Sequence, residues 1–171
     1  MLSRPSQSPR VKPKGPVRWA NDLARALEIP RQDLCKELGS YDCFDRVHRV
    51  ALGGVEPYSV GLDQPLEVAP VTAAIAADRV ALMACQRRIE QDVARPAQAV
   101  LLEDVQELDA SQREAFGHRA YRRLLGRDPS PQELEHLEDF WRELEQEQAT
   151  AAQWALLSCF SVASSMEALF Y

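Results

Sequence analysis

The segment over residues 150–170 constrains the fold more than any other part of the chain. It reads as one helix that is apolar on nearly all sides and has no charge as far as Met166. Its large apolar residues are Trp154, Leu156, Leu157, Phe160, Val162, Met166 and Leu169. A helix without a polar face belongs in the centre of a bundle. Because the uncharged run contains four serines and is shorter than the roughly twenty residues of a membrane span, we expect a buried core helix and no membrane span.

Two capping boxes predict the helices that precede this segment. Ser111 is followed three residues later by Glu114, and Ser130 by Glu133, with Pro131 at the favoured first helical position. Helices are therefore expected to begin near residues 111 and 130. Their apolar residues recur at helical spacing: Ala115, Phe116, Ala120, Tyr121, Leu124 and Leu125, then Leu134, Leu137, Phe140, Trp141 and Leu144.

The first two thirds of the chain predict further helices over about 17–28, 31–39, 42–52, 70–93 and 97–108. The residues expected to face inward are Trp19, Leu23, Ala26 and Leu27, then Leu34, Cys35 and Leu38, then Phe44, Val47, Val50 and Ala51, and finally Ile75, Val80, Leu82, Met83 and Ile89. No segment alternates with the period of a strand over strand length. The predicted fold class is all-α: a single irregular helical bundle of six to eight helices, with a long ordered loop and an extended N-terminal tail.

The charge divides the chain of 171 residues into a basic tail and an acidic body. Residues 1–20 hold five Lys and Arg and no acid, so the 26 acids and the other 15 basic residues leave −11 beyond residue 20. Such a body repels nucleic acid and anionic membranes, and we expect no nucleic-acid partner. We divide the chain into a basic Pro/Ser-rich tail, 1–16, and a helical domain, 17–171.

The tail has two interpretations. Residues 3–16 hold four prolines and three serines and bury too little apolar surface to fold alone. The favoured interpretation of such a segment is a solvated linker. The functional one is a docking segment for an acidic partner surface, with Arg10, Lys12 and Lys14 as its contact residues.

A long loop is expected over residues 53–70, where three glycines and three prolines interrupt any regular element. Loops of this length inside a compact domain are uncommon and often functional. The favoured interpretation is a surface strap packed on the helices. The alternative is a second docking segment, with Tyr58, Leu62 and Leu66 as its anchors.

The four cysteines leave their redox state open. Cys35, Cys43, Cys85 and Cys159 permit two disulfides in three connectivities, and they equally permit four buried thiols. Cys35 and Cys43 are eight residues apart across a turn and are able to pair. The C-x-x-C spacing of zinc knuckles and thioredoxin chemistry does not occur in the sequence.

One cluster of potential metal ligands occurs at Asp42, Cys43, Asp45 and His48. A carboxylate three residues before a histidine on a helix can orient its ring. The spacing matches no established ligand signature, so surface residues are the favoured interpretation and no metal or cofactor is expected. The sequence also lacks the nucleophile elbow, the phosphate loop and the dinucleotide-binding glycine pattern, which leaves an enzymatic function without support.

Arginines cluster around Tyr121 at Arg119, Arg122, Arg123 and Arg127. They form either a site for an anion or acidic partner, or ion pairs with the acids of the following helix. The second interpretation is favoured, because a short connection brings the two antiparallel helices together. The acids expected to pair with them are Glu133, Glu135, Glu138 and Asp139.

Residues 115–171 resemble a bacterial helical module. The resemblance is carried by Tyr121, Leu124, Leu125, Gly126, Arg127, Asp128, Pro129, Glu133, Leu134, Ser165, Glu167 and Leu169. This segment is similar to uncharacterised domains related to phycobilisome linkers, and to C-terminal helical domains of exported planctomycete and myxobacterial proteins. The resemblance implies a helical, non-enzymatic module that packs against larger proteins, and it assigns no catalytic residue.

Together these observations predict a structural or accessory subunit of a larger protein assembly, which docks on other subunits through the tail and the 53–70 loop. The alternative is a small exported binding protein, or an enzyme accessory subunit, with a metal or ligand site near residues 42–48. The sequence as written begins without a signal-peptide pattern, so we expect a cytoplasmic chain. A mature exported chain is the alternative.

Overall fold

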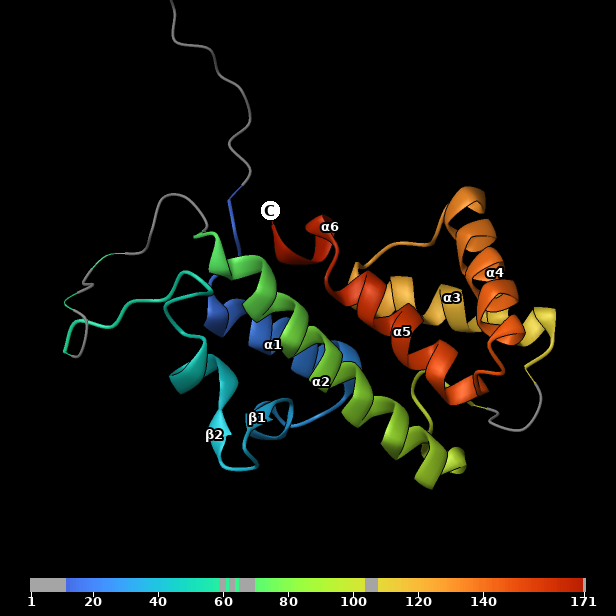
Figure 1. The fold of residues 1–171 in the computed structure, drawn as a ribbon, viewed down its shortest axis with the longest axis horizontal. Helices are drawn as coiled ribbons and strands as arrows, with labels where there is room; N and C mark the ends of the chain where they lie inside the picture. Colours follow the sequence, from blue (N-terminus) through green and yellow to red (C-terminus); the bar gives the residue numbers. More distant parts are fainter. Residues whose placement is uncertain (1–11, 59–60, 62–63, 65–69, 104–107, 171) are drawn as a thin grey trace, which may run out of the picture.

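The computed structural model describes residues 12–58, 61, 64, 70–103 and 108–170 and is mostly helical, which confirms the all-α class (Figure 1). The elements are α1 (Pro16–Leu27), η1 (Arg31–Asp33), β1 (Lys36–Glu37), β2 (Tyr41–Asp42), η2 (Cys43–Val47), α2 (Thr72–Ala94), η3 (Pro96–Gln98), α3 (Ala110–Leu124), α4 (Pro131–Gln146), α5 (Ala151–Ala163) and α6 (Met166–Leu169). The strands form one antiparallel hairpin, Lys36 opposite Asp42 and Glu37 opposite Tyr41. No helix among the described residues has both the length and the apolar character to cross a membrane.

Helices α2 and α5 form the centre of the molecule and lie side by side (Figure 1). The buried face of α2 is made of small residues, Ala76, Ala77, Val80, Ala81 and Ala84, which lets α5 approach closely. The Cys85–Cys159 disulfide joins the two helices. Helix α5 also contacts α3 and α4, so the central position predicted for the uncharged segment is confirmed for α5.

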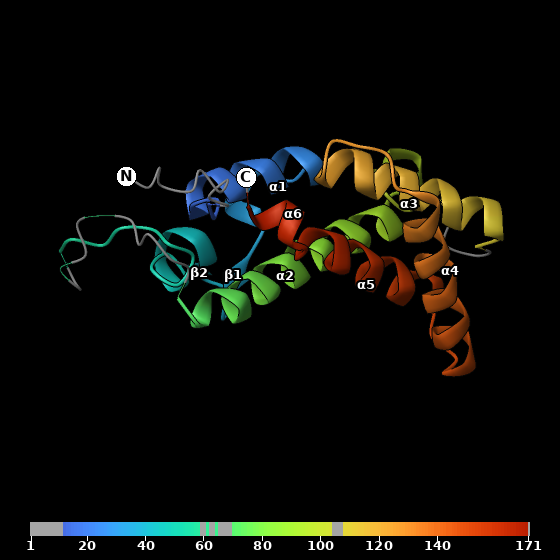
Figure 2. The same ribbon diagram turned by 90° about the horizontal axis from the view of Figure 1, so that it is seen from above.

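An aromatic cluster fixes α3 and α4 on α5. The fully buried ring of Trp154 lies 5.0 Å from the ring of Phe116 and 5.9 Å from the ring of Trp141, measured between centroids. The indole N–H of Trp154 donates to the Leu137 carbonyl at 3.2 Å. Such aromatic pairs add about 0.5–1.5 kcal/mol each beyond the area that they bury. Helix α4 lies at one end of the molecule, away from β1 and β2 (Figure 2).

The two ends of the described chain meet. Pro13 forms an antiparallel bridge with Phe170, and the Lys14 N–H donates to the Leu169 carbonyl at 2.8 Å. Residues 13 and 14, which the sequence assigns to the tail, thus contact the C-terminal turn beside α1 (Figure 2). Pro13 and Phe170 thereby lie at the same end of the molecule as residues 51–53, which lead into the 53–70 segment.

Residues 31–52 differ from the prediction. In place of the helix over 31–39 there is one 3-10 turn, η1, followed by the β1–β2 hairpin, and in place of the helix over 42–52 only the five-residue π-turn η2. The Cys35–Cys43 disulfide closes this hairpin. Leu34 and Phe44 are buried as expected, whereas Leu38 in the turn of the hairpin and Val47 at the end of η2 are exposed.

Three further predictions about elements are corrected. Where the structure describes this segment, at residues 97–103 and 108, the only helical turn is the end of η3, because the backbone N–H groups of Val100, Leu101 and Leu102 donate to Asp92 and not to helical carbonyls. Helix α3 begins at Ala110 through a capping box of Asp109 and Gln112, two residues before the predicted one. The final helix breaks after α5, and Ser165 caps the separate turn α6.

Candidate functional site

The four residues of the predicted metal cluster each have a different role. Asp42 accepts the backbone N–H groups of Phe44 and Asp45 and caps η2. Cys43 is consumed by the disulfide to Cys35. Asp45 pairs with Arg31, and His48 lies 3.1 Å from the Glu37 carboxylate. Within the described ranges no group of three or more His, Cys, Asp and Glu side chains could hold a metal ion, and the predicted cluster is not assembled.

The predicted partner-binding residues are described only in part. Arg10, Leu62 and Leu66 lie outside the described residues. Lys12 is exposed, and Tyr58 is 98% exposed. Lys14 is largely buried, and its ammonium group lies 3.5 Å from the Asp22 carboxylate, which also pairs with Arg18. The Lys14 charge is therefore neutralised within the molecule.

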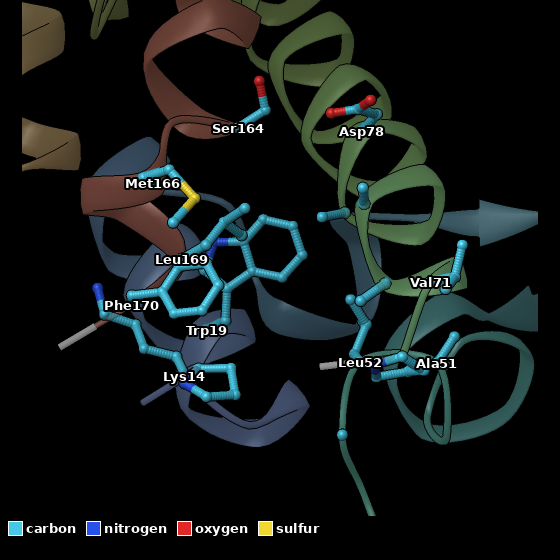
Figure 3. A pocket seen from close by; sticks show the side chains of 16 residues that line it. Lys14, Trp19, Ala51, Leu52, Val71, Asp78, Ser164, Met166, Leu169 and Phe170 are labelled. Atoms are coloured by element: carbon cyan, nitrogen blue, oxygen red, sulfur yellow. The ribbon is translucent and has the colours of Figure 1, made fainter. Parts of the chain in front are cut away.

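An apolar cavity of about 400 Å³ opens between four segments of the chain at this end of the molecule (Figure 3). One side is formed by Trp19 of α1 together with Met166, Leu169 and Phe170. The other side is formed by residues 51–53 and by the first turns of α2. Pro13 and Pro70 both line it, so the cavity lies where residues 1–11 and the 53–70 segment join the described body. Its volume falls in the range of about 300–1,000 Å³ that is typical of binding pockets.

Two polar side chains, Ser164 and Asp78, line the same side of this cavity (Figure 3). Ser164 follows α5, and its hydroxyl donates to the Phe160 carbonyl at 2.9 Å. Asp78 projects from α2 on the same side of the cavity. Asp78 is exposed and has no hydrogen-bond or ion-pair partner in the described part of the chain. Because Lys14 is paired, the uncompensated charge at the rim is negative.

A stripe of exposed apolar residues continues from the cavity along α2. Val71 is 95% exposed, Ile75 is 65% exposed, and Leu82 is also exposed. They are four and seven residues apart, spacings that place them on one face of a helix. One face of α2 packs in the core, and these residues lie on its opposite, solvent-exposed face. We call Val71, Ile75 and Leu82 the α2 stripe; together with Met166, also exposed, it extends the apolar surface beyond the cavity.

Arg127 holds the C-terminal turn that forms one cavity wall. Its guanidinium donates to both carboxylate oxygens of Glu133 (2.7 and 2.9 Å) and to both of Glu167 on α6 (2.7 and 2.8 Å). It also lies 5.2 Å from the ring centroid of Tyr121. Hydrogen bonds from Arg127 and, to a smaller extent, from Ser130 lower the pKa of Glu133 to about 2, and those from Arg127 also lower the pKa of Glu167. The position of α6 therefore depends on this paired arginine.

The other arginines of the cluster around Tyr121 pair elsewhere than predicted. Arg119 pairs with Glu103, Arg122 with Asp128 and Arg123 with Glu28. Among the four predicted acids, Glu133 pairs with Arg127, Glu138 with Arg113 and Asp139 with Arg142. Arg119, Arg122 and Arg123 thus tie α3 to three other parts of the chain, and Arg127, which follows α3, pairs with α4 and α6.

Local sequence patterns do not predict the cavity, because its walls include segments that are more than a hundred residues apart in the sequence. The sequence does contain one indication of the exposed apolar face of α2. Val71, Ile75 and Leu82 lie opposite the small residues Ala76, Ala77 and Val80 around α2. The prediction of Ile75 and Leu82 as core residues is wrong because the alanine-rich face is the one that packs against α5.

Comparisons of this chain with family models, with curated proteins and with solved structures give no match.

Proposed function

We propose that this protein is a non-enzymatic accessory subunit that docks on a larger protein assembly through the end of the molecule that carries the cavity. The docking surface comprises the cavity, the α2 stripe and Met166, together with the extended tail 1–16 and the long ordered 53–70 loop. Of the partner-binding residues predicted in those two segments, Arg10, Lys12, Tyr58, Leu62 and Leu66 are proposed to face the partner, whereas Lys14 pairs with Asp22 within the molecule. No cofactor is required for this role.

The observation that carries the proposal is the coincidence of exposed apolar residues with the cavity. Large apolar side chains that are exposed together around a hollow mark interaction sites in soluble proteins. Here Val71 and Met166 are exposed and line a cavity with an apolar lining, and the exposed Ile75 lies one helical turn further along α2. Exposure of apolar surface to water costs about 25 cal/mol per Å², and a partner that covers these side chains removes this cost. Tyr58, exposed in the adjoining loop, is a residue type enriched at the centres of interfaces.

The pairing of the cysteines bears on the cellular compartment in which the proposed assembly forms. The structure pairs all four of them, Cys35 with Cys43 and Cys85 with Cys159, and no described cysteine is free. Disulfides persist in oxidising environments and are rare where glutathione and thioredoxin keep thiols reduced. We therefore place the assembly in an oxidising compartment, which favours the exported chain over the cytoplasmic one.

Light scattering on the protein purified from the cells that produce it tests the proposal. We expect a complex well above the 19.2 kDa of the chain. The double variant Val71→Asp with Met166→Asp should be released as a monomer. Leu38→Asp is the matched control, because Leu38 is 88% exposed on the hairpin and does not line the cavity. A wild-type monomer at physiological concentration, or equal release by the control, would contradict the proposal.

A further inference from the structure

The α2 stripe has a carboxylate within it. Asp78 lies three residues after Ile75 and four residues before Leu82, so it neighbours both on the helix surface. It also lies four residues after Ala74, which lines the cavity. A partner that covers the apolar residues therefore covers Asp78 as well. Because a carboxylate that is covered without a counterion is strongly unfavourable, we expect the partner to bring a cation to this position.

The described cations nearest to Asp78 in the cavity and on α2 are already paired, so a cation that neutralises Asp78 has to come from the partner. Arg79, the next residue on α2, turns to Glu37 with its guanidinium 3.1 Å from the carboxylate. Lys14, on the opposite wall of the cavity, pairs with Asp22. Ser164 adds a hydroxyl but no charge, and its proton already serves the Phe160 carbonyl. Neither of these described cations is available to neutralise Asp78.

The shape of the surface favours a helical partner segment. The α2 stripe is a straight row of apolar side chains that ends in a cavity, and a second helix packs along such a row by inserting side chains at positions i, i+3, i+4 and i+7. The first turns of α2 and the residues of α6 form the two walls at the cavity end. A row of apolar side chains with a cavity at one end accepts the apolar face of an amphipathic helix.

We propose that the α2 stripe and the cavity bind an amphipathic basic helix of a partner protein, with its apolar face on Val71, Ile75 and Leu82 and a Lys or Arg on Asp78. This inference rests on the proposed function and names the chemistry of the partner segment. The net charge of −11 beyond residue 20 steers a basic segment toward the body from a distance. Specificity arises at Asp78, since an acidic helix would bring a second negative charge to the same place.

A patterned helix library provides the test. The probes are displayed helical peptides with apolar residues fixed along one face, and with Lys, Gln or Glu varied at the flanking positions. Selection on the full-length protein should enrich Lys at the flanking positions, and selection on Asp78→Lys should enrich Glu. Glu90→Lys is the charge-matched control, because Glu90 is an exposed acid nearer the other end of α2, and it should retain the preference for Lys.

Affinities of the selected peptide complete the test. We expect Asp78→Asn to weaken binding by about tenfold or more, because the partner's cation is then covered without its counterion. Ala74→Trp fills the cavity and should weaken binding by about tenfold or more, whereas Ala94→Trp, at the far end of α2, should not. Enrichment of the same flanking residue on wild type and Asp78→Lys, no enrichment, or equal loss in both tryptophan variants would overturn the inference. If it fails while the native complex still dissociates on Val71→Asp with Met166→Asp, the docking function stands and only the basic helix is wrong.

Discussion

Among the described residues, Asp92 is the one carboxylate that is buried in the core. It is fully buried, accepts three backbone N–H groups at 2.9–3.0 Å from Val100, Leu101 and Leu102, and pairs with Arg88 at 2.9 Å. Arg88 in turn donates to the Leu27 carbonyl at 3.0 Å. One side chain thereby joins the end of α2 to the chain that leads into α3, and its partner joins α2 to the end of α1.

Replacement of Asp92 by Ala should lower the free energy of unfolding by about 3–5 kcal/mol, because it leaves Arg88 buried without its counterion and three N–H groups without an acceptor. Urea denaturation followed by circular dichroism measures this loss. Glu90→Gln, an exposed change on the same helix, should shift it by no more than about 0.5 kcal/mol. A loss below about 1 kcal/mol for Asp92→Ala would mean that the network is not structural.

The second prediction at the scale of single residues concerns Arg127 and the stability of the fold at low pH. The hydrogen bonds that Arg127 donates lower the pKa of Glu133 from 4.5 to about 2. A carboxylate with a lowered pKa in the folded state stabilises the fold above its unfolded pKa, and this stabilisation is lost as the pH falls from about 4.5 to about 2. In Arg127→Gln, carbon-13 NMR should show the Glu133 pKa moved toward 4.5.

Arg142→Gln is the control for that titration, because Arg142 pairs with Asp139 on the same helix and not with Glu133. The Glu133 pKa should then stay near 2. An ordinary pKa for Glu133 in the wild type would show that Arg127 does not hold this carboxylate in solution, and that the restraint on α6 is absent.

Among the elements, the two disulfides stabilise loops of very different length. Cys85 and Cys159 are separated by 74 positions and join the central helices, whereas Cys35 and Cys43 are separated by 8 and close one hairpin. In the chain-entropy account a cross-link stabilises the fold more when it closes a longer loop of the unfolded chain. The two bonds therefore contribute unequally.

Paired replacement by alanine should cost about 4 kcal/mol for Cys85 with Cys159, and about 2.5 kcal/mol for Cys35 with Cys43. Guanidinium denaturation of the wild type and of the two double variants gives the comparison. Each variant retains the other disulfide and serves as its control. A larger loss from the hairpin bond than from the central one would contradict the account.

The elements also show how far local patterns reach. The capping box at Ser130 and the periodic residues after it predict α4 correctly, because both signals lie within the helix. The start of α3 is predicted two residues late, since Asp109 with Gln112 and Ser111 with Glu114 are overlapping boxes and the earlier one caps more of the helix. The predicted final helix breaks at Ser164, whose hydroxyl bonds back to Phe160, a competition with the helix that apolarity does not reveal.

At the scale of the whole molecule, the fold class was predictable and the candidate site was not. Long periodic segments and one uncharged helix are sufficient to predict an all-α bundle with α5 inside. The cavity depends on the bridge between Pro13 and Phe170 and on the turn at residues 51–53, contacts between distant parts of the chain that no local pattern encodes. Of the predicted docking residues, Tyr58 and Lys12 are exposed at described positions, and Lys14 is not free.

The central claim is that the cavity end of the molecule is covered by another protein. A photoreactive amino acid placed at Val71 and, separately, at Leu38 tests it most directly, because both side chains are almost fully exposed and only Val71 lines the cavity. After irradiation in the producing cells, we predict one adduct of defined mass from position 71 and none from position 38. No adduct from position 71, or the same adduct from both positions, would contradict the claim.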